Sequence, residues 1–429
     1  MLFESCQKDR VPPLNYISNF DNSVARNWFT LHTRIVKETP GYTAPVAARS
    51  FAYAGVALYQ AVFQGMPGYE SLEGKVNGLP LHKFTPADDS KTYNWGIVAN
   101  AAMTEFYKFI FKNVSAKNLN SIDSLSLFYL DAFKRNISPE VINNSIAYGK
   151  LVAKEVYEYS VSDGMDAAYN TNYPAYSVPK GPGLWIPTGT QQIPLQPYWG
   201  VVRPFLNQNT ELTQIPPSPV YSLDPSSEFY KQANEVYLAV KDQTRDQQII
   251  ANFWNDEPGK TVTPAGHAIS IASQILEKEI ADLKTAAETY LKVGLALHDA
   301  YVSCWKCKYL HNVIRPVSFI KANIDETFQT SIYTPPTPEY TSDYAAQSSA
   351  AFTVLSNLFG ENYHFSDFTN YGRTDIIGIP RNYTSFEEAA TEAGFAGLYG
   401  GIHFRSSIDA GLAQGKQIGK NISLIKIKN

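Results

Sequence analysis

The sequence is short of cysteine, of charge and of long apolar runs. Only three of its 429 residues are cysteines, which excludes a fold held together by a disulfide framework. No run approaches the roughly 18 apolar residues that span a bilayer. Charged residues make up 18% and the net charge is −4, so the chain lacks the basic excess of nucleic-acid-binding proteins. A phosphate loop of the form G-x-x-x-x-G-K-[ST] is also missing.

Aromatic and apolar residues are abundant instead, with 23 Phe, 28 Tyr and 6 Trp in a chain that is 44% apolar. This composition excludes a disordered or coiled-coil chain. Apolar residues recur at helical spacing, as at Val24, Trp28, Leu31 and Ile35, and no region is rich in strand signals. The predicted helices cover residues 24–35, 46–63, 95–111, 122–135, 139–159, 226–240, 246–254, 264–277, 278–309, 343–359, 385–399 and 407–424. The predicted fold class is all-α.

Residues 170–225 interrupt this pattern, because they are dense in Pro and Tyr and show no lasting period. Such a stretch is either a linker between two halves or a loop packed over the surface, and its aromatic content favours the packed loop. We therefore expect one large domain of two helical-bundle halves. Its expected parts are a loose N-terminus (1–20), an N-terminal helical half (21–165), an irregular covering segment (166–225) and a C-terminal helical half with the functional pocket (226–429).

The cysteines suggest two local features. Cys6 follows Leu2-Phe3-Glu4-Ser5, which looks like the end of a bacterial lipoprotein signal, although five residues are too few for a complete one. Either the natural start lies upstream and Cys6 is lipidated, or Cys6 is an ordinary residue. The first alternative places the protein in the bacterial cell envelope, as a periplasmic or outer-membrane lipoprotein. Cys304 and Cys307 have C-x-x-C spacing inside a helical run, which favours a structural or incidental pair over a redox motif.

Two cations stand seven residues apart, at Lys308 and Arg315, directly before Pro316. On a helix this spacing turns through about 700°, close to two full turns, so both cations would share one face. We expect Pro316 to end that helix and to leave Arg315 at its last turn. Two cations facing one way suit a bound oxyanion, whereas a solvated basic face is the plainer interpretation.

The pattern K-x6-R-P resembles the first of three motifs of the vanadium-dependent haloperoxidase and type 2 phosphatidic acid phosphatase superfamily. Other stretches resemble bacterial haloperoxidase-like proteins as well: residues 39–49, 253–256, 263–267, 338–340 and 400–404. The resemblance implies a pocket that binds vanadate, or phosphate in its place, and uses peroxide and halide. The net charge of −4, in turn, predicts no nucleic-acid partner. Lys308 and Arg315 would hold oxygens of the anion.

The other two motifs match only in part. The family's P-S-G-H reads Thr341-Ser342-Asp343-Tyr344 here, so Ser342 is kept as an oxyanion hydrogen-bonding residue, Asp343 replaces glycine, and Tyr344 replaces the acid–base histidine. His403 takes the place of the residue that ligates vanadium, or that attacks phosphorus in the phosphatases.

In the same third motif, Gly397 stands where the second arginine belongs, and Ser407 stands where the phosphatases have aspartate. Arg405 follows His403 by two residues, about 200° around a helix, so we expect it to face elsewhere. Pro264-Ala265-Gly266-His267 imitates P-S-G-H but precedes the Lys–Arg motif, so His267 is interpreted as structural.

These replacements predict weak chemistry. Asp343 could face the anion, form an ion pair with Lys308 or Arg315, or cap the helix that begins there, and each arrangement weakens oxyanion binding. A tyrosine with a pKa near 10 is a poor acid–base group at neutral pH. The sequence therefore predicts a divergent haloperoxidase with weakened or lost activity. The alternatives are a phosphomonoesterase with His403 as nucleophile and a non-catalytic binding or cell-surface protein.

Overall fold

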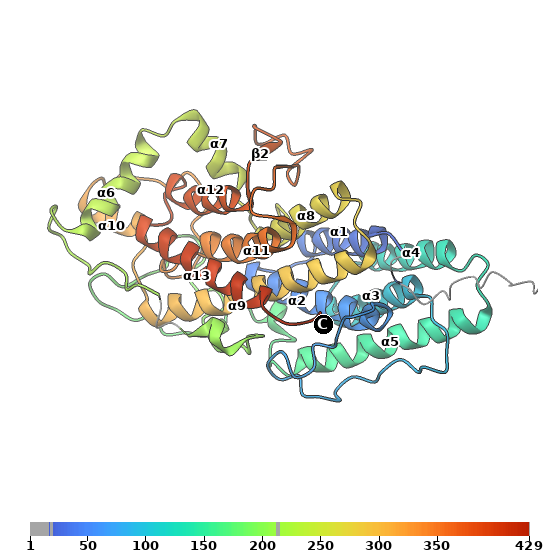
Figure 1. The fold of residues 1–429 in the computed structure, drawn as a ribbon. Helices are drawn as coiled ribbons and strands as arrows, with labels where there is room; N and C mark the ends of the chain where they lie inside the picture. Colours follow the sequence, from blue (N-terminus) through green and yellow to red (C-terminus); the bar gives the residue numbers. More distant parts are fainter. Residues whose placement is uncertain (1–16, 18–19, 212–214, 429) are drawn as a thin grey trace, which may run out of the picture.

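The computed structural model describes residues 17, 20–211 and 215–428, so Cys6 lies outside the described residues. The regular secondary structure of the described chain is almost all α-helix, which confirms the all-α prediction (Figure 1). Its α-helices are α1 (Ser23–Glu38), α2 (Ala44–Val62), α3 (Trp95–Ile110), α4 (Ala116–Phe133), α5 (Pro139–Val161), α6 (Glu228–Lys241), α7 (Arg245–Phe253), α8 (Thr263–Lys278), α9 (Leu283–His311), α10 (Pro316–Asn323), α11 (Asp343–Phe359), α12 (Phe386–Tyr399) and α13 (Arg405–Ser423). None of these described helices combines the length and the apolar character needed to cross a membrane.

The long helix α9 runs through the middle of the molecule and packs along α2 (Figure 1). The two backbones approach closely because small residues line the contact. A Cβ on Gly55 of α2 would lie 2.6 Å from the carbonyl oxygen of Tyr290, and a Cβ on Gly294 of α9 would lie 2.8 Å from Ala52 Cα. Larger side chains at these positions would push the two helices apart.

A second close contact joins α11 and α13, which form the centre of the C-terminal half. Gly411, Gly415 and Gly419 are spaced by four residues on α13 and therefore lie on the face turned toward α11. A Cβ on Gly411 would lie 2.7 Å from the carbonyl oxygen of Ser342. This stripe of glycines brings the first turns of the two helices side by side. The amide of Ser342 therefore reaches the carbonyl of Ser407 and donates a hydrogen bond to it over 3.1 Å.

The described part of residues 166–225 contains short 3₁₀ turns and no α-helix, and it packs against the helices. Trp185 and Trp199 are completely buried there. Asp299 of α9 fastens the segment, because its carboxylate accepts hydrogen bonds from the backbone amides of Phe205 and Leu206 at 2.7 and 3.0 Å. These contacts hold the covering segment to the helices at residues 185, 199 and 205–206.

The region around Pro316 differs from the prediction. Helix α9 ends at His311, Asn312 adopts a left-handed conformation with φ 48°, and Pro316 starts the new helix α10. The expectation that Pro316 ends a helix carrying both cations is wrong, because proline is also favoured at the first position of a helix. Arg315 is the N-cap residue of α10.

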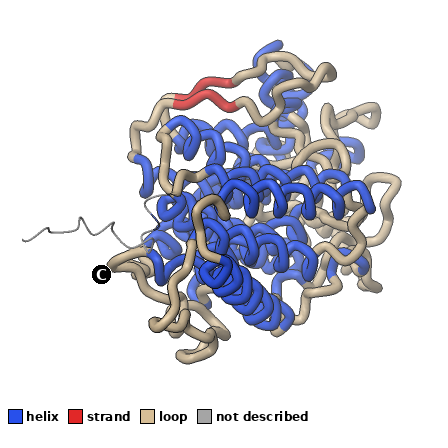
Figure 2. The backbone as a smooth tube through the Cα atoms, turned by 90° about the vertical axis from the view of Figure 1, so that its right-hand side faces the viewer, coloured by secondary structure: helices blue, strands red, loops and turns tan. Residues whose placement is uncertain are grey.

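The other differences are smaller. The predicted helix 278–309 starts later, at Leu283, after Asp282 has capped it by accepting from the Thr285 amide. Nothing in the local pattern indicated the one small sheet in the described residues, in which β1 (Phe365–Asp367) pairs antiparallel with β2 (Arg381–Tyr383). This hairpin lies at the edge of the helical body (Figure 2).

His267 of α8 joins this hairpin to the helices. Its Nδ1 lies 2.7 Å from a carboxylate oxygen of Asp256, and its Nε2 lies 2.7 Å from one of Asp367 at the end of β1. All three side chains are buried, and Trp254 stacks on the imidazole. Burial lowers the pKa of His267, but the two carboxylates outweigh this effect and raise the pKa to about 10. This buried contact between one imidazole and two carboxylates agrees with the interpretation of His267 as a structural residue.

We predict that His267→Gln lowers the free energy of unfolding by about 3–5 kcal/mol, because it leaves a buried carboxylate without its charged partner. In the natural protein the folded pKa of His267 exceeds the unfolded value of about 6.5. Its stabilisation is therefore complete below about pH 6.5 and is lost as the pH rises through about 10.

Guanidinium unfolding between pH 6 and pH 10 measures both effects. The control is His364→Gln, because His364 is an exposed histidine next to the same hairpin. If the free energy of unfolding has the same pH dependence in the natural protein and in His267→Gln, His267 does not form charged contacts with the two carboxylates.

Candidate functional site

Lys308, Arg315 and His403 meet in one buried place between α9, α10 and α13. All three side chains are completely buried. Arg315 Nη1 lies 3.4 Å from His403 Nε2, and both cations lie close to the loop that leads into α11. The structure thus brings together residues that the sequence places up to 95 positions apart.

The covering segment holds the turn between the two cations. Leu184 forms an antiparallel bridge with Val313, and the Trp185 amide donates to the carbonyl of Asn312 over 2.7 Å. The Ile314 amide in turn donates to the carbonyl of Gly183 over 2.9 Å. This pairing fixes the extended backbone that carries the chain from α9 to Arg315. The covering segment therefore takes part in building the site.

Glu339 links the parts of the site, although no role was predicted for it. Its carboxylate oxygen Oε1 accepts hydrogen bonds from His403 Nδ1 at 2.8 Å and from the Phe404 amide at 3.0 Å. Its backbone carbonyl accepts from Lys308 Nζ and from Ser407 Oγ. These bonds orient the imidazole so that Nε2 points at the cations. Only the resemblance of residues 338–340 hinted at Glu339, since nothing in its local pattern indicates a partner 64 residues away.

Asp343 occupies the place opposite Nε2. Its oxygen Oδ1 lies 3.2 Å from Lys308 Nζ and 3.5 Å from His403 Nε2. Burial alone would raise the pKa of Asp343, but Lys308 and His403 hold that pKa well below its usual range. The carboxylate is therefore ionised and forms an ion pair with Lys308. The N-cap of α11 is Ser342, whose Oγ accepts from the Ala345 amide.

Most donors of the two cations are already bonded to protein atoms. Lys308 Nζ donates to the carbonyls of Pro338 and Glu339 at 3.2 Å each, and its third contact is with Asp343. The guanidinium of Arg315 bonds to the carbonyls of Thr337 and Ile402 and to the Thr337 hydroxyl, besides its contact with His403. A bound oxyanion would have to replace some of these bonds.

The remaining residues of the motifs surround this centre. Tyr344 is buried among Ala251, Ile332 and Ile402, and burial raises its pKa well above its ordinary value. Its phenol therefore stays neutral and has little capacity to accept or deliver a proton at neutral pH. Arg405 points away from the centre and bonds to Glu235.

Gly397 lies directly against the imidazole of His403. A Cβ on Gly397 would lie 3.0 Å from His403 Cδ2, so even a small side chain would press on the ring. The carbonyl of Gly397 also accepts from the amides of Ile402 and His403, which closes the turn between α12 and α13. The place of the family's second arginine is therefore taken up by a tight turn.

The two cations of this site lie near carboxylates of the same chain. Lys308 forms an ion pair with Asp343, and Glu339 contacts His403, whose other ring nitrogen lies against Arg315. Because the groups are buried, the attraction between them is only weakly screened by salt. A site of this kind attracts an additional anion much less than two free cations would.

Cys304 and Cys307 are both free and buried on α9, next to this site. Burial raises the pKa of each thiol to about 12. Both thiols are therefore protonated at neutral pH and unreactive, as expected for a structural pair rather than a redox motif.

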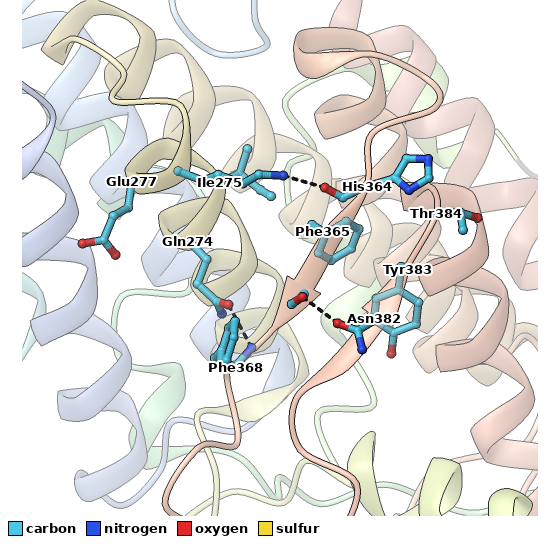
Figure 3. Close-up of a pocket in the computed structure, with 11 residues that line it drawn as sticks. Gln274, Ile275, Glu277, His364, Phe365, Phe368, Asn382, Tyr383 and Thr384 are labelled. Atoms are coloured by element: carbon cyan, nitrogen blue, oxygen red, sulfur yellow. Dashed lines mark hydrogen bonds between the residues drawn. The ribbon is translucent and has the colours of Figure 1, made fainter.

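A surface pocket of about 680 Å³ lies elsewhere, between α8 and the hairpin (Figure 3). Aromatic side chains of Phe365, Phe368 and Tyr383 line it, and Gln274 bonds to the backbone amide of Phe368. None of the residues of the three motifs lines this pocket.

We predict that Glu339→Gln lowers the free energy of unfolding by about 1.5–3 kcal/mol, because two buried hydrogen bonds lose a charged acceptor. The change keeps the shape of the side chain, so it tests the charge alone. The matched control is Glu361→Gln, an exposed carboxylate whose loss should cost less than about 0.5 kcal/mol. Guanidinium unfolding midpoints compare the two, and equal midpoints would contradict the central role of Glu339.

Comparisons with known proteins identify relatives of this fold. The family model of the VCPO second helical-bundle domain matches residues 288–426. A search of curated protein sequences finds no match. Two solved structures of a bacterial vanadium-dependent chloroperoxidase, in apo and holo form, share the fold at TM-scores of 0.66 each and 15% and 16% identity. They cover 90% and 91% of this chain, and the matches span 94% and 93% of theirs.

The crystal structure of a bacterial vanadium-dependent iodoperoxidase is more similar. It aligns with a TM-score of 0.83 and 32% sequence identity, over 94% of this chain and 96% of the other. Sequence identity at this level, over nearly the whole length of both chains, indicates a common family and not only a shared fold. The chain belongs to the vanadium-dependent haloperoxidase family.

Proposed function

We propose that this chain is a divergent haloperoxidase-family protein whose oxyanion pocket is filled by its own Asp343. Vanadate and phosphate then bind weakly, and peroxide-dependent halide oxidation is lost or severely weakened. The observation that carries the proposal is the position of Asp343 Oδ1, 3.2 Å from Lys308 Nζ and 3.5 Å from His403 Nε2. An anion that binds through the same two groups has to compete with this carboxylate.

Simple electrostatics gives the size of the loss in anion affinity. Two like charges about 4 Å apart repel by roughly 4 kcal/mol at an effective dielectric constant near 20. Such a penalty lowers affinity by about three orders of magnitude.

Vanadate, where a member of this family binds it, supplies the chemistry that activates peroxide toward halide. His403 Nε2, Lys308 and Arg315 are the groups of this chain that would hold it, with Ser342 beside them. These groups do not fit the anion as they stand, because most of their donors bond to protein atoms and Asp343 lies in front of Nε2. No catalytic step through vanadate therefore follows for this chain.

A second candidate function is a slow iodoperoxidase. The 32% identity to a bacterial iodoperoxidase favours it, as does the imidazole of His403, which Glu339 still orients toward the cations. A phosphomonoesterase with His403 as nucleophile would use the same pocket and meets the same obstacle at Asp343. If none of these activities is present, the protein is a binding or cell-surface protein on the haloperoxidase scaffold.

The cellular place that fits this proposal is the bacterial cell envelope, with a lipid anchor at Cys6. The support is the sequence context of Cys6, together with the predicted loose N-terminus that precedes the first helix.

We predict that Asp343→Gly lowers the dissociation constant for orthovanadate at least about 100-fold, because it removes both the charge and the atoms that fill the site. Asp343→Asn removes only the charge and should give an intermediate affinity. Asp409→Asn on the exposed side of α13 is the control and should change nothing. Isothermal titration calorimetry with vanadate and, separately, phosphate measures the series. An unchanged affinity of Asp343→Gly for vanadate would contradict the proposal that Asp343 fills the pocket.

For activity, we predict that natural protein and His403→Ala oxidise iodide with peroxide at the same background rate. The triple variant Asp343→Gly, Tyr344→His and Gly397→Arg should exceed both by at least about 100-fold, since an acid–base group alone contributes 10²–10⁴-fold. The change at Gly397 requires the His403 ring to shift by a few tenths of an ångström. Triiodide absorbance in the presence of vanadate follows the reaction. A natural rate that His403→Ala abolishes would establish the slow iodoperoxidase instead.

A further inference from the structure

Thr337 contacts Arg315 through two atoms. Its carbonyl oxygen accepts a hydrogen bond from Arg315 Nε at 2.9 Å, and its hydroxyl oxygen accepts one from Arg315 Nη2 at 2.8 Å. Both residues are buried, with Thr337 1% exposed and Arg315 0% exposed. Because Nε and Nη2 form one edge of the planar guanidinium, a single residue occupies that whole edge.

The backbone around Thr337 is restricted. Three prolines stand next to it, at positions 335, 336 and 338, and each proline ring fixes its own φ angle. Two positions further on, the Glu339 amide donates to the carbonyl of Val313 over 3.0 Å, which joins this segment to the strand of backbone that carries Arg315. Thr337 is therefore held at a fixed distance from the guanidinium.

The guanidinium keeps two further donors. Of its five N–H groups, Thr337 takes one on Nε and one on Nη2, and the carbonyl of Ile402 takes one on Nη1 at 2.9 Å. This leaves one N–H on each terminal nitrogen. Among the described residues their one remaining contact is His403 Nε2, 3.4 Å from Nη1. Two donors on the terminal nitrogens of one guanidinium can bind two oxygens of the same oxyanion.

We propose that Thr337 is the positioning residue for Arg315 in the oxyanion pocket. By holding the edge formed by Nε and Nη2, it keeps the remaining donors directed at the place in front of His403. An anion that enters after Asp343 is removed then meets a guanidinium that is already oriented. This inference rests on the proposed function, in which vanadate or phosphate binds at that place when Asp343 does not fill it.

The opposite role would be a threonine that withholds Arg315 from the anion. The geometry disfavours it, because the edge that Thr337 occupies does not include Nη1, the nitrogen that contacts His403. The two roles predict opposite results. Loss of the Thr337 hydroxyl weakens anion binding if the residue positions Arg315, and strengthens it if the residue withholds Arg315.

The first test measures anion affinity in the Asp343→Gly background by isothermal titration calorimetry, with orthovanadate and with inorganic phosphate. Thr337→Val keeps the shape and removes the hydroxyl, so it should raise the dissociation constant at least about tenfold, the weight of one hydrogen bond to a charged group. Thr337→Ser keeps the hydroxyl and should stay within about threefold of the Asp343→Gly parent.

The matched control is Thr39→Val, because Thr39 is a buried threonine whose hydroxyl has no hydrogen-bond partner. It should change the dissociation constant less than about twofold. A Thr337→Val variant that binds either anion as tightly as its parent, or more tightly, overturns the proposal. So does a Thr337→Ser variant that binds as weakly as Thr337→Val, since the hydroxyl is then not the group that matters.

A second measurement needs no anion and uses the otherwise natural protein with ¹⁵N-labelled arginine. A guanidinium held on two sides rotates slowly, so Arg315 should give separate signals for its two Nη nitrogens, assigned with Arg315→Lys. Thr337→Val should broaden or merge these signals, and Thr337→Ser should keep them separate. If Asp343→Gly fails to tighten vanadate binding, the proposed function fails, and the Nη signals still decide the role of Thr337. Signals that stay separate and sharp in Thr337→Val overturn it.

Discussion

The contact between α11 and α13 is the constraint on which the site depends. The glycines of α13 let the two backbones touch, so that the amide of Ser342 reaches the carbonyl of Ser407 and the two helices begin at the same level. His403 lies just before one of these helices, and Glu339 and Asp343 lie on either side of the start of the other. A side chain on Gly411 would collide with the carbonyl oxygen of Ser342 and push α11 away from α13. This movement would separate Asp343 from His403.

Around this contact the protein supplies partners for its buried cations from its own residues. The cations of α9 and α10, the imidazole and the two carboxylates bond to one another and to backbone carbonyls. A site that is to hold an external anion needs cations with free donors, which cost stability when the anion is absent. The chain described here avoids this cost, and the loss of free donors is the physical counterpart of its altered motifs.

The sequence predicted the fold class, and it predicted that Lys308 and Arg315 lie in one site. The reason for the second prediction, a shared helix face, is only partly right. Both cations reach the site although they do not share a helix, because the covering segment pairs with the backbone between them. That pairing joins segments far apart in the sequence and has no local signal. The orientation of Asp343 could not be predicted either, since capping, facing an anion and pairing with Lys308 are all compatible with its local sequence.

The long-range partners of buried charges were the least predictable part. Glu339 and His403 are 64 residues apart, and His267 and Asp367 are 100 residues apart. Helical periodicity reports which face of a helix is apolar, but it carries no information on which distant carboxylate meets a buried imidazole. Only the three-dimensional packing of α8, α11 and α13 decides these pairs.

The internal position of Asp343 also changes how the folded state responds to its surroundings. A free ligand stabilises a protein according to its concentration, and this contribution disappears when the ligand is scarce. A carboxylate attached to the chain acts as a ligand whose effective concentration is set by the fold and is never diluted. If Asp343 fills the pocket as proposed, the folding of this protein does not depend on the supply of vanadate or phosphate.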